Sequence, residues 1–159
     1  MSGGHLQHNI FRVPDIGNFR DAAAAIIVME DGRYLMQQCD DISGIFYPDH
    51  WGLFGGALEP GESGETALRR ELREELGFTP DSVHYFTNME FDFACLGGGR
   101  RIRVLYEVEL AVDKLSQLWL TEGRSMQALD ITEILLTRRL VPYDSFAIWM
   151  HHARQSSGI

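Results

Sequence analysis

Cysteine, basic residues and long apolar runs are all scarce in this sequence. The two cysteines, Cys39 and Cys95, are too few for a disulfide framework and do not form a CxxC pair, so a reducing, cytoplasmic setting is expected. The longest apolar run, residues 22–29, is too short to cross a bilayer. Residues 1–9 lack the basic and apolar regions of a signal peptide. No membrane association is therefore predicted.

Acidic residues outnumber basic ones by 23 to 14, which gives a formal net charge of -9. Nucleic-acid backbone is bound by clustered lysine and arginine, so this balance argues against nucleic acid as a partner. A small anionic substrate stays compatible with the charge, because a bound cation reverses the local sign of the potential. The 159 residues fit a single domain, with residues 1–9 and 155–159 expected to be loose tails.

Apolar periodicity and turn residues predict alternating strands and helices. The expected strands are 22–30 and 33–40, joined by an Asp31-Gly32 hairpin turn, then 51–54 running into a Gly55-Gly56 break, then 83–93 and 101–112. The expected helices are 63–76, 130–139 and a last one that is capped by Asp144 or Ser145 and ends near residue 154. This order predicts an α/β domain with a mixed sheet covered by helices.

The segment 63–76 carries the clearest helix signals. Ser63 is suited to cap its start, and Gly77 is suited to end it. Leu68, Leu72 and Leu76 are spaced four apart, so they form one apolar stripe that is expected to face the core.

Glu71, Glu74 and Glu75 occupy a different face of this helix, because spacings of three and four residues bring side chains together. Carboxylates so close repel one another, and the C-terminal half of a helix favours cations instead. Nearby arginines supply part of the compensating charge, and a bound Mg²⁺ would supply more, since it prefers carboxylate oxygens. Taken alone, the carboxylates favour the simpler alternative of a solvated acidic face with arginine partners.

The residues before the helix change that balance. A glycine-rich loop, residues 55–62, runs directly into it, and loop and helix together hold a fixed pattern. The pattern is Gly56, five residues, Glu62, seven residues, Arg70-Glu71-Leu72, one residue, Glu74-Glu75, one residue, Gly77-Phe78. It resembles the complete Nudix box, the signature of a family of diphosphate hydrolases. The stretch 51–56 looks like the usual lead-in to the box, except that Phe54 stands where many relatives have proline.

The resemblance implies an α/β/α sandwich that hydrolyses a diphosphate bond with Mg²⁺ as its cofactor, or Mn²⁺ in its place. By position, it implies that the metal ligands are Glu71, Glu74, Glu75 and the backbone carbonyl of Gly55. Arg70 matches a residue that orients these glutamates by salt bridges, and Glu62 matches a glutamate with a mainly structural role.

The resemblance specifies the general base and the substrate contacts less closely. In relatives the base is often a loop glutamate beyond the box, which suggests Glu122, with Glu90 and Asp92 as alternatives. The candidates for stacking on a base are Phe46, Tyr47 and Trp51, and those for contacting phosphate or sugar are Arg100, Arg101 and Arg103. Core packing of the aromatic residues and a solvated strand end for the arginines are the competing interpretations.

The expected partner is a small nucleotide-like substrate, and elimination of subgroup patterns favours a nucleoside triphosphate or an NDP-sugar. Two other functions share the fold: a module that senses a nucleotide without cleaving it, and an isomerase of isoprenoid diphosphates. Sensing modules often lose box glutamates, but this chain has all of them. The isomerase needs a reactive cysteine, and neither Cys39 nor Cys95 has a matching context. The sequence leaves open whether the protein forms a homodimer.

Overall fold

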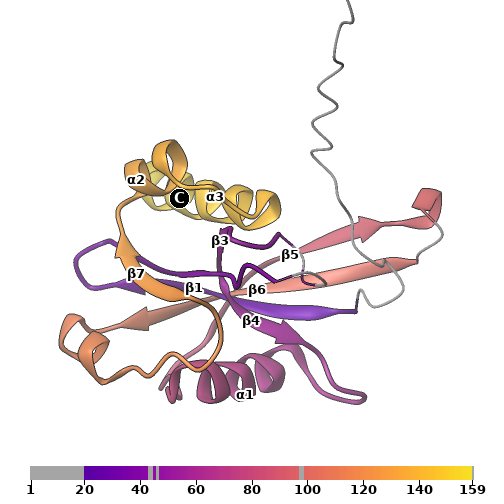
Figure 1. Ribbon diagram of the computed structural model, residues 1–159, viewed down its shortest axis with the longest axis horizontal. Helices are drawn as coiled ribbons and strands as arrows, with labels where there is room; N and C mark the ends of the chain where they lie inside the picture. The colour runs from indigo at the N-terminus through magenta and orange to yellow at the C-terminus, as the bar shows by residue number, and fades with distance from the viewer. Residues whose placement is uncertain (1–19, 43–44, 46, 97–98, 159) are drawn as a thin grey trace, which may run out of the picture.

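The computed structural model describes residues 20–42, 45, 47–96 and 99–158, so the predicted tail 1–9 lies outside the described residues. Within them, one seven-stranded mixed sheet lies between helix α1 on one face and helices α2 and α3 on the other (Figure 1). The α/β/α sandwich expected from the sequence is confirmed. No helix in this part of the chain is both long and apolar enough to cross a membrane.

The strands are β1 Ala22–Met29, β2 Tyr34–Gln38, β3 Trp51–Gly52, β4 Phe54–Ala57, β5 His84–Asp92, β6 Arg100–Leu110 and β7 Ser125–Leu129. The α-helices are α1 Gly64–Leu76, α2 Ile131–Thr137 and α3 Pro142–Ser157. Two short 3-10 helices, Ala94–Leu96 and Val112–Gln117, follow β5 and β6.

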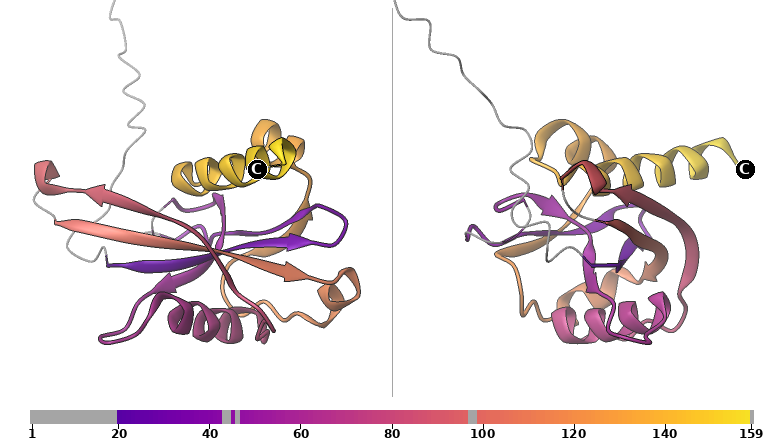
Figure 2. Two further views of the ribbon diagram at one scale, coloured as in Figure 1. Left: turned by 180° about the vertical axis from the view of Figure 1, so that it is seen from behind. Right: turned by 90° about the vertical axis from the view of Figure 1, so that its right-hand side faces the viewer.

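β1 is the central strand of the sheet, and it pairs differently with the strands on its two sides. β6 runs parallel to β1 along one edge. On the other edge two antiparallel strands follow one another, because β4 pairs with residues 22–25 and β2 pairs with Ile27 and Val28. The sheet therefore splits between β2 and β4, and Leu53, which joins β3 to β4, lies at the split. The turned views in Figure 2 show these strands crossing between the two helical layers.

Alternate residues of β1 point to opposite faces of the sheet and supply two separate cores. Ala23, Ala25 and Ile27 are buried against the leucine stripe of α1. Ala24 and Ile26 are buried on the other face, in the core that α2 and α3 cover. A shift of one residue in the pairing of β1 would exchange the two faces. β1 thus fixes both helical layers relative to the strands that carry the site.

Two differences from the predicted strands bear on the site. Gly55 and Gly56 do not break a strand but belong to β4, where they pair with Ala24 and Ala23. β7 is absent from the prediction, since Ser-Met-Gln-Ala-Leu has neither β-branched residues nor clear alternation. It forms because each of its residues pairs with a residue of β2. Both differences result from pairing with distant strands.

β5 does not have the single buried face that its alternation predicts. Its register is irregular, because Tyr85 pairs with Tyr106 but Thr87 pairs with Leu105, so the alternate residues before and after the irregularity point to opposite faces of the sheet. The Tyr85 ring contacts Tyr106 and is 61% exposed, whereas the Phe86 ring contacts His151 of α3. The strand lies at the edge of the sheet, which explains why its residues are at most half-buried.

The last two helices have different ends from those predicted. Asp130 caps α2 as expected. However, α3 begins at Pro142, which suits a first helical turn because it lacks an N–H group. Asp144 is therefore not the cap of α3 but lies inside its first turn. The helix continues to Ser157, so the expectation of a loose tail over 155–159 is wrong up to that residue.

Candidate active site

Two adjacent glycines of β4 bring its backbone unusually close to other groups. Gly55 has a φ of 131°, and a Cβ there would overlap the carbonyl oxygen of Ala23. A Cβ on Gly56 would overlap the carboxylate of Glu71. The glycine pair therefore lets a strand and an acidic side chain occupy space that any larger residue would fill.

Helix α1 begins, ends and packs as the sequence predicts. Ser63 accepts a hydrogen bond from the backbone N–H of Thr66 at 3.2 Å, and Gly77 ends the helix in the left-handed region with a φ of 63°. The leucine stripe is fully buried beneath the sheet. Because that stripe faces the core, the acidic residues of the helix lie along the side that meets β4 and solvent.

Arg70 is the charge centre of this acidic side. Its guanidinium donates to both carboxylate oxygens of Glu62 at 3.0 Å, to Glu71 at 2.7 Å and to Glu74 at 3.4 Å. It also donates to the backbone carbonyl of Ala57 at 3.0 Å. Hydrogen bonds from Arg70 lower the pKa of Glu62, which keeps that carboxylate charged. Arg70 thus ties the loop 55–62 to the middle of α1.

Glu75 is buried, with only 5% of its surface exposed. Its Oε2 accepts a hydrogen bond from the backbone N–H of Gly55 at 3.0 Å. Burial raises the pKa of Glu75 to about 8, and the negative charges of Glu71 and Glu122 add to the rise. A nearby cation would favour the ionised form of such a carboxyl group.

The donor set fits a hard divalent cation. Glu75 hydrogen-bonds the backbone N–H of Gly55, and Glu71 fills the space beside Gly56, so two carboxylates lie against this backbone and offer oxygen ligands of the kind that Mg²⁺ prefers. No three acidic, histidine or cysteine side chains among the described residues already converge on one point. Arg70 holds Glu71 and Glu74 in ion pairs, of which the pair with Glu74 is longer.

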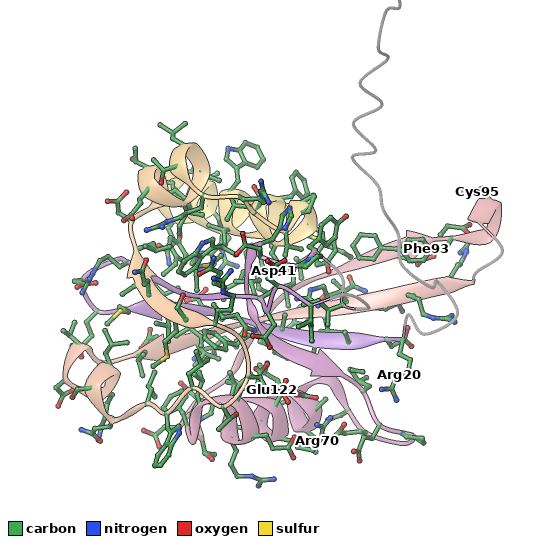
Figure 3. The ribbon with its side chains drawn as sticks, viewed as in Figure 1. Arg20, Asp41, Arg70, Phe93, Cys95 and Glu122 are labelled. Atoms are coloured by element: carbon green, nitrogen blue, oxygen red, sulfur yellow. The ribbon has the colours of Figure 1, made fainter. Side chains whose placement is uncertain are left out.

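The loop before β7 lies against the C-terminal end of α1. Thr121 donates through its backbone N–H to the carbonyl of Glu75 at 2.9 Å and through its hydroxyl to the carbonyl of Glu74 at 2.6 Å. The last carbonyls of a helix have no partner within the helix, so Thr121 supplies hydrogen bonds that these two would otherwise lack. Glu122 follows directly, is exposed, and lies near enough to raise the pKa of Glu75. Figure 3 shows Glu122 beside α1. The structure thus brings the candidate base close to Glu71, Glu74 and Glu75, which together are called the carboxylate cluster.

The aromatic candidates differ in their surroundings. Trp51 is 6% exposed in the core, with the guanidinium of Arg138 4.9 Å above its ring, so a stacking role for it is wrong. Tyr47 is half-buried, has a left-handed backbone with a φ of 54°, and its ring lies 5.8 Å from that of Tyr143. Phe46 lies outside the described residues.

The charged candidates at the end of the β5–β6 hairpin form ion pairs and hydrogen bonds with one another. Arg100 pairs with Glu90 at 3.0 Å and with Asp92 at 3.7 Å, and all three are well exposed. Glu90 and Asp92 therefore lie in exposed ion pairs on the hairpin. Arg101 donates to the carbonyl of Arg100 at 2.7 Å and lines a cleft of about 440 Å³ together with Arg20, Asp21 and loop 58–62.

Sequence reasoning misses a buried contact between α3 and the strand residues before β4. Asp144 is 3% exposed, accepts a hydrogen bond from the N–H of Leu53 at 3.0 Å and pairs with Arg103 at 3.1 Å. Arg103 is thus engaged in a buried ion pair within the protein. Gln37 donates to the carbonyl of Leu53 at 3.1 Å. An aspartate at a helix start is typical of a cap, so the sequence carries no signal for this distant partner.

Comparison with known proteins agrees with this geometry. Residues 18–150 match the NUDIX domain. The chain belongs to the Nudix family. The nucleoside triphosphatase NudI of Escherichia coli O9:H4 (strain HS) is 53% identical to this Nudix chain over 51 residues, which are 32% of the chain and 36% of the relative. The chain thus matches only about a third of the length of such curated relatives.

Solved structures share the fold of this Nudix domain at low sequence identity. A MutT protein from Methanosarcina mazei Go1 has a TM-score of 0.67 at 22% identity, and the match covers 85% of this chain and 95% of that one. The NUDIX domain of Shewanella oneidensis NrtR, solved with ADP ribose, has a TM-score of 0.68 at 16% identity over 95% and 94% of the two chains. These likenesses establish the architecture.

Proposed function

We propose that this Nudix domain is a Mg²⁺-dependent hydrolase that cleaves the diphosphate bond of a nucleoside triphosphate or an NDP-sugar. The observation that carries the proposal is Glu75, a buried carboxyl beside Glu71 whose pKa burial raises to about 8. Burying acidic groups together is costly unless a positive charge joins them, so a divalent cation at this point accounts for the arrangement. The stretch shared with the nucleoside triphosphatase NudI supports a triphosphate substrate.

The proposed reaction is a substitution at phosphorus by water. A bound Mg²⁺ would neutralise the diphosphate and lower the pKa of an adjacent water. Glu71, Glu74 and Glu75 would hold the ion, while Arg70 keeps the first two oriented. Glu122 would accept the proton of the water as its oxygen bonds to phosphorus and the bridging P–O bond breaks. The products would be a nucleoside monophosphate and a phosphorylated leaving group.

The nucleoside part is proposed to lie against Tyr47. This ring and that of Tyr143 meet edge to face and are both half-buried, so each keeps part of its surface accessible. Aromatic faces stack on nucleic-acid bases with little regard to base type. Arg101, at the cleft beside loop 58–62, is proposed to meet a phosphate or sugar group. The protein is proposed to act on a small molecule, without nucleic acid or a membrane.

The two cysteines argue against an isomerase of isoprenoid diphosphates. A reactive cysteine needs an accessible thiolate. Burial raises the pKa of Cys39 to about 11, which keeps its thiol protonated near neutral pH. Cys95 is exposed beyond the end of β5, far along the hairpin from α1 (Figure 3). A hydrolase therefore fits the described residues better.

A substrate screen tests the proposed function. Nucleoside triphosphates, NDP-sugars, ADP-ribose and dinucleoside polyphosphates are incubated with the protein and Mg²⁺ or Mn²⁺, and products are followed by phosphorus NMR. We expect turnover of one of the first two classes, its loss in EDTA, and its return when Mg²⁺ is added back. Running the reaction in ¹⁸O-water identifies the phosphorus that water attacks. Tight nucleotide binding by calorimetry without any turnover would instead establish a sensing module.

Glu122→Gln is expected to lower kcat by about 10²- to 10⁴-fold, because a positioned base contributes that much to proton transfer. The acid limb of the pH–kcat profile should disappear with it, since that limb records ionisation of the base. Glu109→Gln provides the control, as Glu109 is an exposed acid at the far end of β6. A profile for Glu122→Gln that superimposes on that of the wild type would remove Glu122 as the base.

A further inference from the structure

The strand segment that carries Gly55 is held from both helical layers. From α1, Glu75 accepts the hydrogen bond of the Gly55 N–H at 3.0 Å. From α3, Asp144 accepts the hydrogen bond of the Leu53 N–H at 3.0 Å. Leu53 and Gly55 are two residues apart, so the two carboxylates bind neighbouring N–H donors of one short segment.

Glycines on this segment make room for the carboxylates. A Cβ on Gly52 would lie 2.9 Å from Oδ2 of Asp144, and a Cβ on Gly56 would overlap Glu71. The close approach of Asp144 to the strand therefore depends on Gly52, as the close approach of Glu71 depends on Gly56. The two contacts lie at opposite ends of the segment 52–56.

Arg103 holds Asp144 in this position. Its guanidinium lies 3.1 Å from Oδ1 of Asp144, and the two side chains are only 14% and 4% exposed. The Cζ atom of the same guanidinium lies 5.0 Å from the ring centre of Tyr143, which precedes Asp144 in α3. A buried ion pair contributes little net stability compared with apolar residues of similar size. Fixing the geometry of a neighbouring group is a role that such a pair can fill.

We infer that Asp144 is a positioning residue that holds the Leu53–Gly55 backbone where Glu75 and the proposed cation meet it. Arg103 keeps the Asp144 carboxylate directed at Leu53. Without an acceptor for the Leu53 N–H, the segment can move away from α3, and Gly55 moves with it. This inference rests on the proposed function, to which it adds a contact from the helical layer opposite α1.

Two double variants separate the effect of the hydrogen-bond acceptor at position 144 from the effect of the buried charges on Asp144 and Arg103. In Asp144→Asn/Arg103→Met the buried charges are gone, but the side-chain carbonyl still accepts from Leu53. In Asp144→Leu/Arg103→Met the charges are equally absent, and the acceptor is missing as well. Because neither variant leaves an unpaired buried charge, their comparison reports on the single hydrogen bond to Leu53.

The first measurement is hydrogen exchange at the Gly55 amide, followed by NMR in the metal-free protein. We expect its protection to be about tenfold lower in the leucine variant than in the asparagine variant, because loss of a tether increases local opening. The second measurement is turnover of the substrate found in the screen. We expect kcat to fall by about 10- to 100-fold in the leucine variant, with KM nearly constant, as for residues that orient metal ligands. The asparagine variant should retain most of the kcat.

Equal protection of Gly55 in the two double variants would overturn the inference, and so would lower protection with equal kcat. If the leucine variant does not fold, Gly52→Ala replaces it, since the new Cβ would displace the Asp144 carboxylate. Normal Gly55 protection in Gly52→Ala would overturn the inference as well. Failure of the proposed function gives a different result: the wild type would turn over no substrate, while the Gly55 comparison would still decide whether Asp144 positions the strand.

Discussion

Replacing Glu75 by glutamine is expected to lower kcat roughly 10³-fold, since a metal ion supplies several kcal/mol of transition-state stabilisation and each 1.4 kcal/mol is tenfold in rate. Glutamine keeps an oxygen that can accept the Gly55 N–H, so β4 should stay in place beside α1. The loss should therefore come from the missing negative charge and not from unfolding. Steady-state kinetics at saturating Mg²⁺, with a thermal melt of the same sample, checks both parts.

The neighbouring acids of α1 provide comparisons for this result. Glu74→Gln should also lower kcat by orders of magnitude, although the Glu74 side chain is 56% exposed and is held by a 3.4 Å pair with Arg70. Glu65→Gln is the matched control, because Glu65 lies on the same helix but pairs with Arg69 away from the cluster. Near-normal turnover by both the Glu74 and Glu75 variants would contradict the proposed metal site.

The parts of this protein that the sequence predicts well are those specified by nearby residues. Helix α1 follows from its cap at Ser63, its terminal Gly77 and its leucine spacing, all of which act within one or two turns. The grouping of acidic side chains follows from helix geometry in the same way. The position of Glu122 beside that group is also anticipated, but only through the family resemblance, because the loop contacts α1 through Thr121.

The parts that the sequence does not predict depend on distant partners. β7 has a weak strand sequence and forms through its pairing with β2. Gly55 and Gly56 suggest a break, yet pairing with β1 makes them part of a strand. Asp144 sits where a helix cap is expected, but its carboxylate turns to Leu53, 91 positions away in the sequence. Each of these depends on how the layers pack, which local patterns do not specify.

The metal-free protein should lose stability as the pH rises, and Glu75 is the cause. Burial raises the folded-state pKa of Glu75 from an ordinary 4.5 to about 8, so the folded protein binds a proton that the unfolded chain releases. The stabilisation from that proton is complete below about pH 4.5 and is lost as the pH rises through 8. We expect the Tm in EDTA to fall by roughly 5–10 °C more in the wild type than in Glu75→Gln between pH 6 and 9.

Mg²⁺ should oppose this loss, because the cation takes the place of the proton on Glu75. The rise in Tm that saturating Mg²⁺ produces should therefore be larger at pH 8.5 than at pH 6, where the ion must first displace the proton. Calorimetric melts at several pH values, with EDTA or Mg²⁺, measure both effects on one sample. Parallel pH profiles for the wild type and Glu75→Gln in EDTA would show that Glu75 ionises normally. The buried carboxylate would then no longer explain why a cation is needed between α1 and β4.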